Sequence, residues 1–222
     1  MSAGGIIFLG PSLVPRPPDT SHLQYRPPAG RGDLERAADS GARVIGLIDG
    51  VFGQTLAVTP AEVRAVAQRG IRLLGGASIG ALRACECPTA MQGIGEIWQR
   101  FTCGELTDDD EVAVTFLPGT YQLVAHPLVQ VREAARLAAE RYPNAREELG
   151  QLITEVRQLP FVERTLERIR EAAAPVLDTG LPWPQLHEWL TAPEFDLKRR
   201  DAEVVIEAVT QALAAARFAS QS

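Results

Sequence analysis

The sequence predicts an α/β fold: a small parallel sheet of Rossmann-like βαβ units, followed by an all-helical C-terminal region. Short apolar runs at residues 5–9, 43–48 and 70–75 alternate with helical segments in the first half of the chain, and such alternation is typical of a parallel sheet. Later in the chain, periodic alanine, leucine and arginine residues punctuated by prolines indicate helices only. We therefore expect an α/β core over residues 1–125 and a helical region over residues 126–222.

The first strand is expected at residues 5–9, where the apolar run stops at Gly10-Pro11-Ser12. Residues 14–33 hold much of the proline and lack helical periodicity, so we expect a surface loop there. A short helix over residues 34–40 then leads into a buried strand at residues 43–48. These elements make the first β-α-β unit.

A second helix is expected to begin after Thr59-Pro60-Ala61-Glu62. Threonine at the N-cap, proline at the first helical position and glutamate three residues after the cap form a capping box. The third strand follows at residues 70–75, and the next helix begins at Ser78 and ends before Pro88. This order continues the βαβ alternation.

The remaining elements are irregular near the middle of the chain and helical after it. A short helix is expected over residues 93–101 and a further strand over residues 112–114. The C-terminal helices predicted from the proline-punctuated pattern cover residues 127–141, 144–158, 160–173, 183–191 and 197–218.

Composition and charge argue against several classes of function. The net charge of −6 and the pI near 5.2 argue against binding to nucleic-acid backbones, which depends on clustered cations. The sequence has no run of about 18 apolar residues that would predict a membrane span. Its N-terminus lacks a secretion signal. We therefore expect a cytoplasmic protein that binds neither nucleic acid nor membrane.

Two groups of side chains, the cysteines and an acidic run, are candidates for a metal or redox role. Cys85, Cys87 and Cys103 are odd in number and lack metal-ligand spacing, so we expect neither a disulfide framework nor a zinc site. The acidic run Asp108-Asp109-Asp110-Glu111 could hold Mg²⁺, but adjacent side chains diverge and such runs are usually solvated. We expect no metal and no cofactor.

Three strand ends are expected to meet at one rim of the sheet. Ligands of open parallel sheets bind beyond the carboxyl ends of the strands. That rule brings together Gly10-Pro11-Ser12, Asp49-Gly50 and the turn at Ser78. The convergence of three independent loops indicates a functional site more strongly than any one motif does.

Gly76-x-Ser78-x-Gly80 lies between a strand and a helix, which is the context of the nucleophile elbow of hydrolases. The first turn of that helix is expected to offer unpaired N–H groups to an anion. Small residues at such a crossover also serve close packing, so both explanations stay open. A hydrolase needs a general base as well, but the one lysine, Lys198, lies far along the chain. The three histidines each have an innocuous explanation: His22 in a polar loop, His126 before a proline at a helix entry, and His187 in an amphipathic helix.

Five segments of the chain resemble the TfuA family and occur in that family's order. They lie between residue 6 and about residue 114, and the helical C-terminal region carries no matching motif. The segments are Ile7-Phe8-Leu9-Gly10-Pro11-Ser12, Tyr25-Arg26-Pro27-Pro28-Ala29-Gly30-Arg31-Gly32-Asp33, Ile48-Asp49-Gly50-Val51-Phe52, Gly76-Ala77-Ser78-Ile79-Gly80-Ala81-Leu82-Arg83-Ala84-Cys85-Glu86 and Asp108-Asp109-Asp110-Glu111-Val112-Ala113.

The resemblance implies a partner of YcaO-type ATP-dependent enzymes, the cyclodehydratases and thioamide synthetases, in peptide backbone thioamidation. In that pathway the TfuA protein is thought to help release sulfur from a thiocarboxylated ThiS-like carrier protein. Such a carrier ends in a flexible Gly-Gly thiocarboxylate, which needs a narrow slot, cations for its charge and donors for an oxyanion.

This implied substrate gives the rim residues roles as a hypothesis. Ser78 and Asp49 are expected to act at the thioacid carbonyl, as in a serine-type or acid-assisted hydrolase. The residues expected to bind the carrier tail are Arg26, Arg31, Arg83, Gly10, Ser12, Gly50, Gly76 and Ile79.

One segment departs from the family. Members commonly have a histidine after the Asp-Gly-x-Phe turn, where this chain reads Ala57-Val58-Thr59-Pro60-Ala61-Glu62-Val63, so Asp49 becomes the nearest acid to polarise Ser78 or a water. Two other functions stay open. One is a non-catalytic adaptor that docks a YcaO enzyme through the helical region and presents carrier or peptide. The other is a general esterase, which ranks last because the base is missing.

Overall fold

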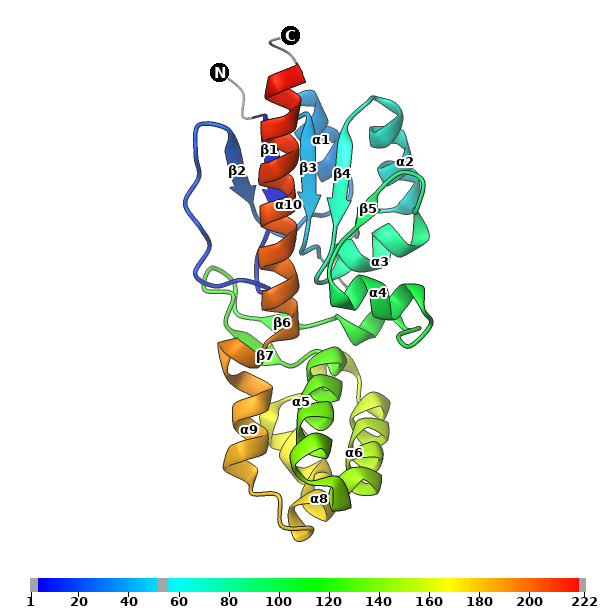
Figure 1. The fold of residues 1–222 in the computed structure, drawn as a ribbon, viewed down its shortest axis with the longest axis vertical. Coiled ribbons are helices and arrows are strands. Elements are labelled where there is room, and N and C mark those ends of the chain that lie inside the picture. The colour runs from blue at the N-terminus through cyan, green and yellow to red at the C-terminus, as the bar shows by residue number, and fades with distance from the viewer. Residues whose placement is uncertain (1–3, 52–55, 220–222) are drawn as a thin grey trace. The chain divides into compact units, whose positions relative to one another are not determined.

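The structure is a computed structural model that describes residues 4–51 and 56–219 (Figure 1). It confirms the α/β fold with a parallel sheet and a helical region later in the chain. The five strands of the sheet are β1 (Gly5–Phe8), β2 (Leu23–Arg26), β3 (Val44–Leu47), β4 (Arg72–Gly75) and β5 (Gln92–Gly93). They lie side by side in the order β2-β1-β3-β4-β5, and every neighbouring pair is parallel.

The chain forms two compact units. The first, the α/β unit, comprises Met1–Thr107 and Lys198–Ser222, and the second, the helical unit, comprises Asp108–Leu197. This division differs from the boundary expected after residue 125. Residues 198–222 belong to the α/β unit because the last helix, α10 (Leu197–Ala219), packs on the sheet with its apolar face.

The strand order creates a topological switch point beside β1. The chain runs from β1 to β2 on one side of β1 and then to β3 on its other side. Phe8 of β1 pairs with Arg26 of β2 and Leu47 of β3, and Leu47 pairs with Gly75 of β4, so these strands end level with one another. The gap between the carboxyl ends of β1 and β3 is where an open parallel sheet binds its ligands.

Helices cover both faces of the sheet. In Figure 1, α1 (Asp33–Asp39), α2 (Pro60–Gln68) and α3 (Ile79–Glu86) lie on one face and α10 lies on the other. Each strand contributes apolar side chains to both faces, because successive side chains of a strand point in opposite directions. Toward α1, α2 and α3 point Ile6, Phe8, Ile45, Leu47 and Leu73; toward α10 point Ile7, Leu9, Val44, Ile48 and Leu74.

The start of α2 follows the predicted cap in part. The Glu62 N–H donates to Thr59 Oγ1 at 3.2 Å, as the capping box requires. The Glu62 side chain does not reach back to the cap, because its Oε1 accepts the Leu34 N–H of α1 at 3.0 Å. The reciprocal half of the box is therefore wrong, and Glu62 instead links α2 to the first turn of α1.

Two short strands of the five-stranded sheet, β2 and β5, were not expected from the sequence. β2 lies inside residues 14–33, which were expected to form a loop, and β5 has only two residues. β2 is an edge strand in which buried Leu23 and Tyr25 alternate with the exposed Gln24. It therefore shows no continuous apolar run. Beyond β5, α4 (Glu96–Thr102) corresponds to the helix expected over residues 93–101.

The helical unit packs five α-helices around its own apolar core. These helices are α5 (Leu128–Arg141), α6 (Arg146–Gln158), α7 (Leu166–Ala172), α8 (Ala174–Asp178) and α9 (Trp183–Thr191). The strand expected over residues 112–114 is wrong, since the antiparallel pair of this unit is β6 (Thr115–Phe116) with β7 (Leu123–Ala125).

The acidic run at residues 108–111 anchors arginines of the helical unit. Asp108 pairs with Arg157, Asp110 pairs with Arg164, and Glu111 pairs with Arg132, whose Nη2 lies 2.7 Å from Glu111 Oε1. The Arg164 side chain is fully buried and the Glu111 side chain is 1 % exposed. Buried charges need such partners. Three of the four acids therefore form ion pairs within the helical unit, whereas a run of this kind was expected to be solvated.

Candidate functional site

At the switch point, the Asp49 carboxylate after β3 binds the loop that follows β1. Asp49 Oδ2 accepts the N–H groups of Gly10 at 2.9 Å and Ser12 at 3.0 Å, and Asp49 Oδ1 accepts the Ser12 hydroxyl at 2.6 Å. Asp49 is 1 % exposed and Ser12 is 2 % exposed. The three bonds fill most of the roughly four acceptor positions of a carboxylate. Asp49 therefore holds the loop after β1 in place.

Backbone contacts join the Asp49-Gly50 loop to the turn at Ser78. The Gly76 N–H donates to Leu47 O at 3.2 Å. The Gly80 N–H donates to Ile48 O at 3.3 Å. A methyl group built on Gly50 would lie 2.6 Å from Ile79 Cγ2, so these two residues touch. The three strand ends predicted to converge are thus brought together. Asp49, however, makes no hydrogen bond to Ser78 in the described part of the chain.

The turn before α3 is strained one residue ahead of the serine. Ala77 has a φ of 64°, which is unusual for a residue with a Cβ, and the Ser78 N–H donates to Gly76 O at 2.7 Å. Ser78 itself is the N-cap of α3, without a side-chain cap hydrogen bond, and is 7 % exposed. Strain of this kind concentrates at functional turns. It supports a functional reading of the Gly76-x-Ser78-x-Gly80 segment.

Most N–H groups of this turn are already used, which corrects the expectation of several unpaired donors. The Gly80 N–H donates to Ile48 O, and the N–H groups of Ala81 and Leu82 donate to Ser78 O. From residue 78 to residue 82, the Ile79 N–H is the amide without a partner among the described residues. The Ile79 N–H is therefore one backbone donor of this turn that can meet an oxyanion.

The three arginines expected to bind an anionic tail have different surroundings. Arg83 Nε donates to Val58 O at 2.7 Å, and its Nη1 pairs with Glu86, so this guanidinium is engaged within the fold. Arg26 Nη2 donates to Ser40 Oγ at 3.1 Å, at the end of α1.

Arg31 is exposed beside the Ala29-Gly50 bridge that extends the rim. Its N–H donates to Leu56 O at 2.8 Å. Its guanidinium has no hydrogen bond or ion pair within residues 4–51 and 56–219. Arg31 is therefore the arginine of the three whose charge is available to a ligand. Phe52, which ends the Asp-Gly-x-Phe motif, lies outside the described residues.

His126 and His187 lie in the helical unit, and His22 lies in the loop before β2. His126 precedes α5 in the helical unit and is 7 % exposed, and its Nδ1 has no hydrogen-bond partner among the residues that the structure describes. Burial, reinforced by nearby His187, lowers the pKa of His126 from 6.5 to about 4. His126 and His187 thus belong to the packing of the helical unit.

We expect the His126 pKa to make the protein less stable in acid. The unfolded chain takes up a proton near pH 6.5 and the folded chain only near pH 4, so the free energy of unfolding should fall by about 3 kcal/mol as the pH drops through that window. Urea unfolding at pH 7, 5.5 and 4.5 measures the slope. His126→Gln should flatten it, whereas His22→Gln, at an exposed loop position, should not. An equal slope in wild type and His126→Gln would refute this.

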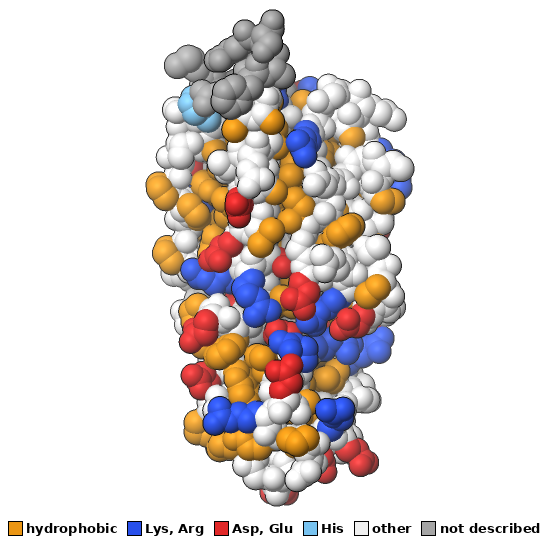
Figure 2. Space-filling model, viewed as in Figure 1, with side chains coloured by type: hydrophobic (Ala, Val, Ile, Leu, Met, Phe, Trp, Pro, Cys, Tyr) orange, Lys and Arg blue, Asp and Glu red, His pale blue; other side chains and the backbone are white. Residues whose placement is uncertain are grey.

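Other chemistry-bearing groups are dispersed. No cluster of three or more histidine, cysteine, aspartate or glutamate side chains suited to a metal ion occurs among the described residues. Burial raises the pKa of the Cys87 thiol, which lies 3.7 Å from Pro60 O. On the face drawn in Figure 2, acidic side chains stand among the basic ones. Across the described ranges, every helix is too short or too polar to cross a bilayer.

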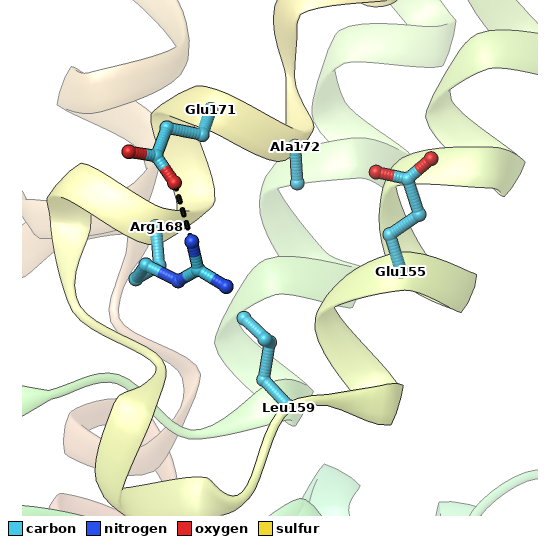
Figure 3. A pocket seen from close by; sticks show the side chains of 5 residues that line it. All are labelled: Glu155, Leu159, Arg168, Glu171 and Ala172. Carbon is cyan, nitrogen blue, oxygen red and sulfur yellow. Dashed lines mark hydrogen bonds and ion pairs between the residues drawn. The ribbon is translucent and has the colours of Figure 1, made fainter.

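The helical unit carries a small open pocket between α6 and α7, with a volume of about 250 Å³. Leu159 and Ala172 give it apolar walls, and Arg168 and Glu171 form an ion pair at 2.7 Å on one side (Figure 3). Glu155 stands on the opposite side, on α6. The carboxylates outnumber the guanidinium, so the pocket has an acidic excess.

Comparison with known proteins agrees with the motifs at the rim. The sequence profile of a family described as TfuA-like protein matches residues 49–165, more than half of the 222-residue chain. The match includes Asp49, Ser78 and the acidic run at residues 108–111. A search of curated proteins finds no match. Because this match covers more than half of the chain, the chain belongs to the TfuA-like family.

Proposed function

We propose that this protein is an accessory protein of YcaO-dependent peptide backbone thioamidation that releases sulfur by hydrolysing a thiocarboxylated ThiS-like carrier protein. Membership of the TfuA-like family supports a role in thioamidation-related pathways generally. The observation that carries the finer proposal is the meeting of three loops at the switch point, with Ser78 and the Ile79 N–H at the end of β4.

The proposed reaction uses Ser78 as the nucleophile. Its Oγ attacks the thiocarboxylate carbon of the carrier, the C–O bond forms, the C–S bond breaks, and sulfide leaves with the hydroxyl proton. Water then hydrolyses the ester and restores the serine and a carrier carboxylate. The Ile79 N–H stabilises the oxyanion of each tetrahedral intermediate.

Asp49 takes a positioning role in this proposal. Its carboxylate holds Gly10 and Ser12, and Gly50 touches Ile79, so Asp49 fixes the loops that lie next to the Ser78 turn. Arg31 supplies the cation for the carrier tail. Arg83 binds Val58 O just before α2, and Arg26 binds Ser40 at the end of α1. Incubation of purified protein with thiocarboxylated carrier, followed by sulfide measurement, tests the proposal.

A second candidate function is a non-catalytic adaptor that docks a YcaO enzyme. The pocket between α6 and α7 favours it, because an apolar wall with an acidic excess suits one lysine or arginine of a partner, its stem on Leu159 and its charge near Glu155.

If the adaptor function holds, Glu155→Arg should weaken binding of the YcaO enzyme at least about tenfold, because it reverses the charge that meets the partner's cation. Calorimetric titration measures the affinity. Glu147→Arg, an exposed position on the same helix, is the matched control and should bind as wild type does. Equal affinities of all three proteins would remove the pocket from the interface.

A further inference from the structure

The last helix reaches the Ser78 turn along the length of the sheet. α10 runs antiparallel to the strands. Leu213 touches Gly5 at the start of β1, Val209 touches Gly46 within β3, and Val205 touches Gly76 just beyond β4. The first turns of α10 therefore lie at the carboxyl rim, where the proposed chemistry takes place.

Asp201 projects from this part of α10 onto the start of α4. Its Oδ1 accepts the Glu96 N–H and its Oδ2 accepts the Ile97 N–H, both at 2.8 Å. Asp201 is 3 % exposed. Burial raises the pKa of Asp201 and Glu96 adds to the rise, while the two backbone N–H bonds and Arg200 oppose it. Its carboxylate caps a helix that begins more than 100 residues earlier in the sequence.

The capped segment supports the turn that carries Ser78. Ile94, two residues before Glu96, donates its N–H to Gly75 O at 2.9 Å. A methyl group built on Gly76 would lie 2.4 Å from Ile94 O and 2.6 Å from Val205 Cγ2. Ile94 and Val205 of α10 thus pack against Gly76 from two sides. A shift of either would move the strained peptide of Ala77 and the serine after it.

We propose that Asp201 is a positioning residue for the Ser78 turn. By capping α4 it fixes residues 94–97, which hold Gly75 and Gly76 and so set the placement of Ser78 and the Ile79 N–H. The catalytic part of this inference rests on the proposed hydrolysis of the thiocarboxylated carrier. The mechanical link between Asp201 and the turn does not depend on the reaction.

The test compares Asp201→Asn with Glu203→Gln. The asparagine amide nitrogen would face a backbone N–H, so one of the two caps is lost with little change of volume. Glu203 lies on the same helix, where it pairs with Arg199 at 3.3 Å, and serves as the matched control. Asp201→Glu keeps the charge but displaces the two carboxylate oxygens from the N–H groups of Glu96 and Ile97. It replaces Asp201→Asn in the experiment if Asp201→Asn does not fold.

Two readouts are taken on each protein, namely amide hydrogen exchange of residues 74–80 and the kinetics of sulfide release. In Asp201→Asn we expect faster exchange of that segment and a kcat at least about tenfold lower, because a misplaced nucleophile loses rate more than binding. KM should stay within about twofold. Glu203→Gln should match wild type in both readouts.

Unchanged exchange in a folded Asp201→Asn protein overturns the inference, and so does faster exchange with an unchanged kcat. If wild type releases no sulfide while Asp201→Asn exchanges faster, the proposed hydrolysis fails but Asp201 still positions the turn. The two proposals can therefore fail separately.

Discussion

Replacement of Ser78 by alanine is expected to lower the rate of sulfide release from a thiocarboxylated carrier at least about 100-fold. The serine is the proposed nucleophile, so alanine removes the oxygen that attacks the thioacid carbon. The side chain does not cap α3, so the usual cost of losing a helix cap does not apply. The measurement is sulfide produced per protein per minute, beside the urea unfolding midpoint of the same sample.

The control for this variant is Ser21→Ala, at an exposed position in the loop before β2. It should release sulfide at the wild-type rate. A folded Ser78→Ala protein that is as active as Ser21→Ala would show that Ser78 is not the nucleophile. If Ser78→Ala still stimulated a YcaO enzyme supplied with free sulfide, that stimulation would favour the adaptor function.

The largest effect on stability is expected from Gly80→Ala. A Cβ at residue 80 would lie 1.7 Å from Leu47 O, a backbone atom at the end of the central strand β3. The clash can be relieved only by moving α3 away from the sheet, which would also break the Gly80 bond to Ile48 O. We expect a loss of more than about 3 kcal/mol in the free energy of unfolding.

Gly150→Ala is the matched control for Gly80→Ala. Gly150 lies inside α6 with open space around its Cα. Alanine there should raise stability by about 0.5–1 kcal/mol, because glycine is a poor helix former. Chemical denaturation of the three proteins compares them directly. A Gly80→Ala protein as stable as wild type would mean that α3 does not approach β3 as closely as described.

The central elements of the fold could be predicted because burial on both sides leaves a plain pattern. β1 and β3 are continuous apolar runs and β4 is apolar after Arg72, as strands covered by helices on both faces tend to be. β2 could not, because an edge strand with one buried face shows only Leu23 and Tyr25 in alternation within a proline-rich stretch. The position of α10 could not either, since its apolar periodicity does not say which surface it covers.

For the candidate site, the sequence predicted which loops come together but not which contacts their side chains make. The rule that parallel strands end at one rim was enough to bring Ser12, Asp49 and Ser78 together. The rule does not predict the partners of long side chains, which bind whichever acceptors lie within their reach. Arg83 donates to Val58 O and Arg26 donates to Ser40 Oγ.

Asp201 illustrates what a motif search misses. The sequence signal for it is weak: an acid on the face of a helix that also carries Ala202 and Val205. Its partners lie more than 100 residues away, so no local spacing identifies them. A buried acid on an apolar helix face is nevertheless a reason to look for a distant cap, because such a charge must find donors.

The most direct test of the proposed hydrolysis is sulfide release by the purified protein alone from a thiocarboxylated ThiS-like carrier. We expect sulfide in proportion to protein, one carrier carboxylate formed per sulfide, and no requirement for a YcaO enzyme or ATP. Sulfide release no faster than from the carrier in buffer would contradict the hydrolytic function of the Ser78 rim.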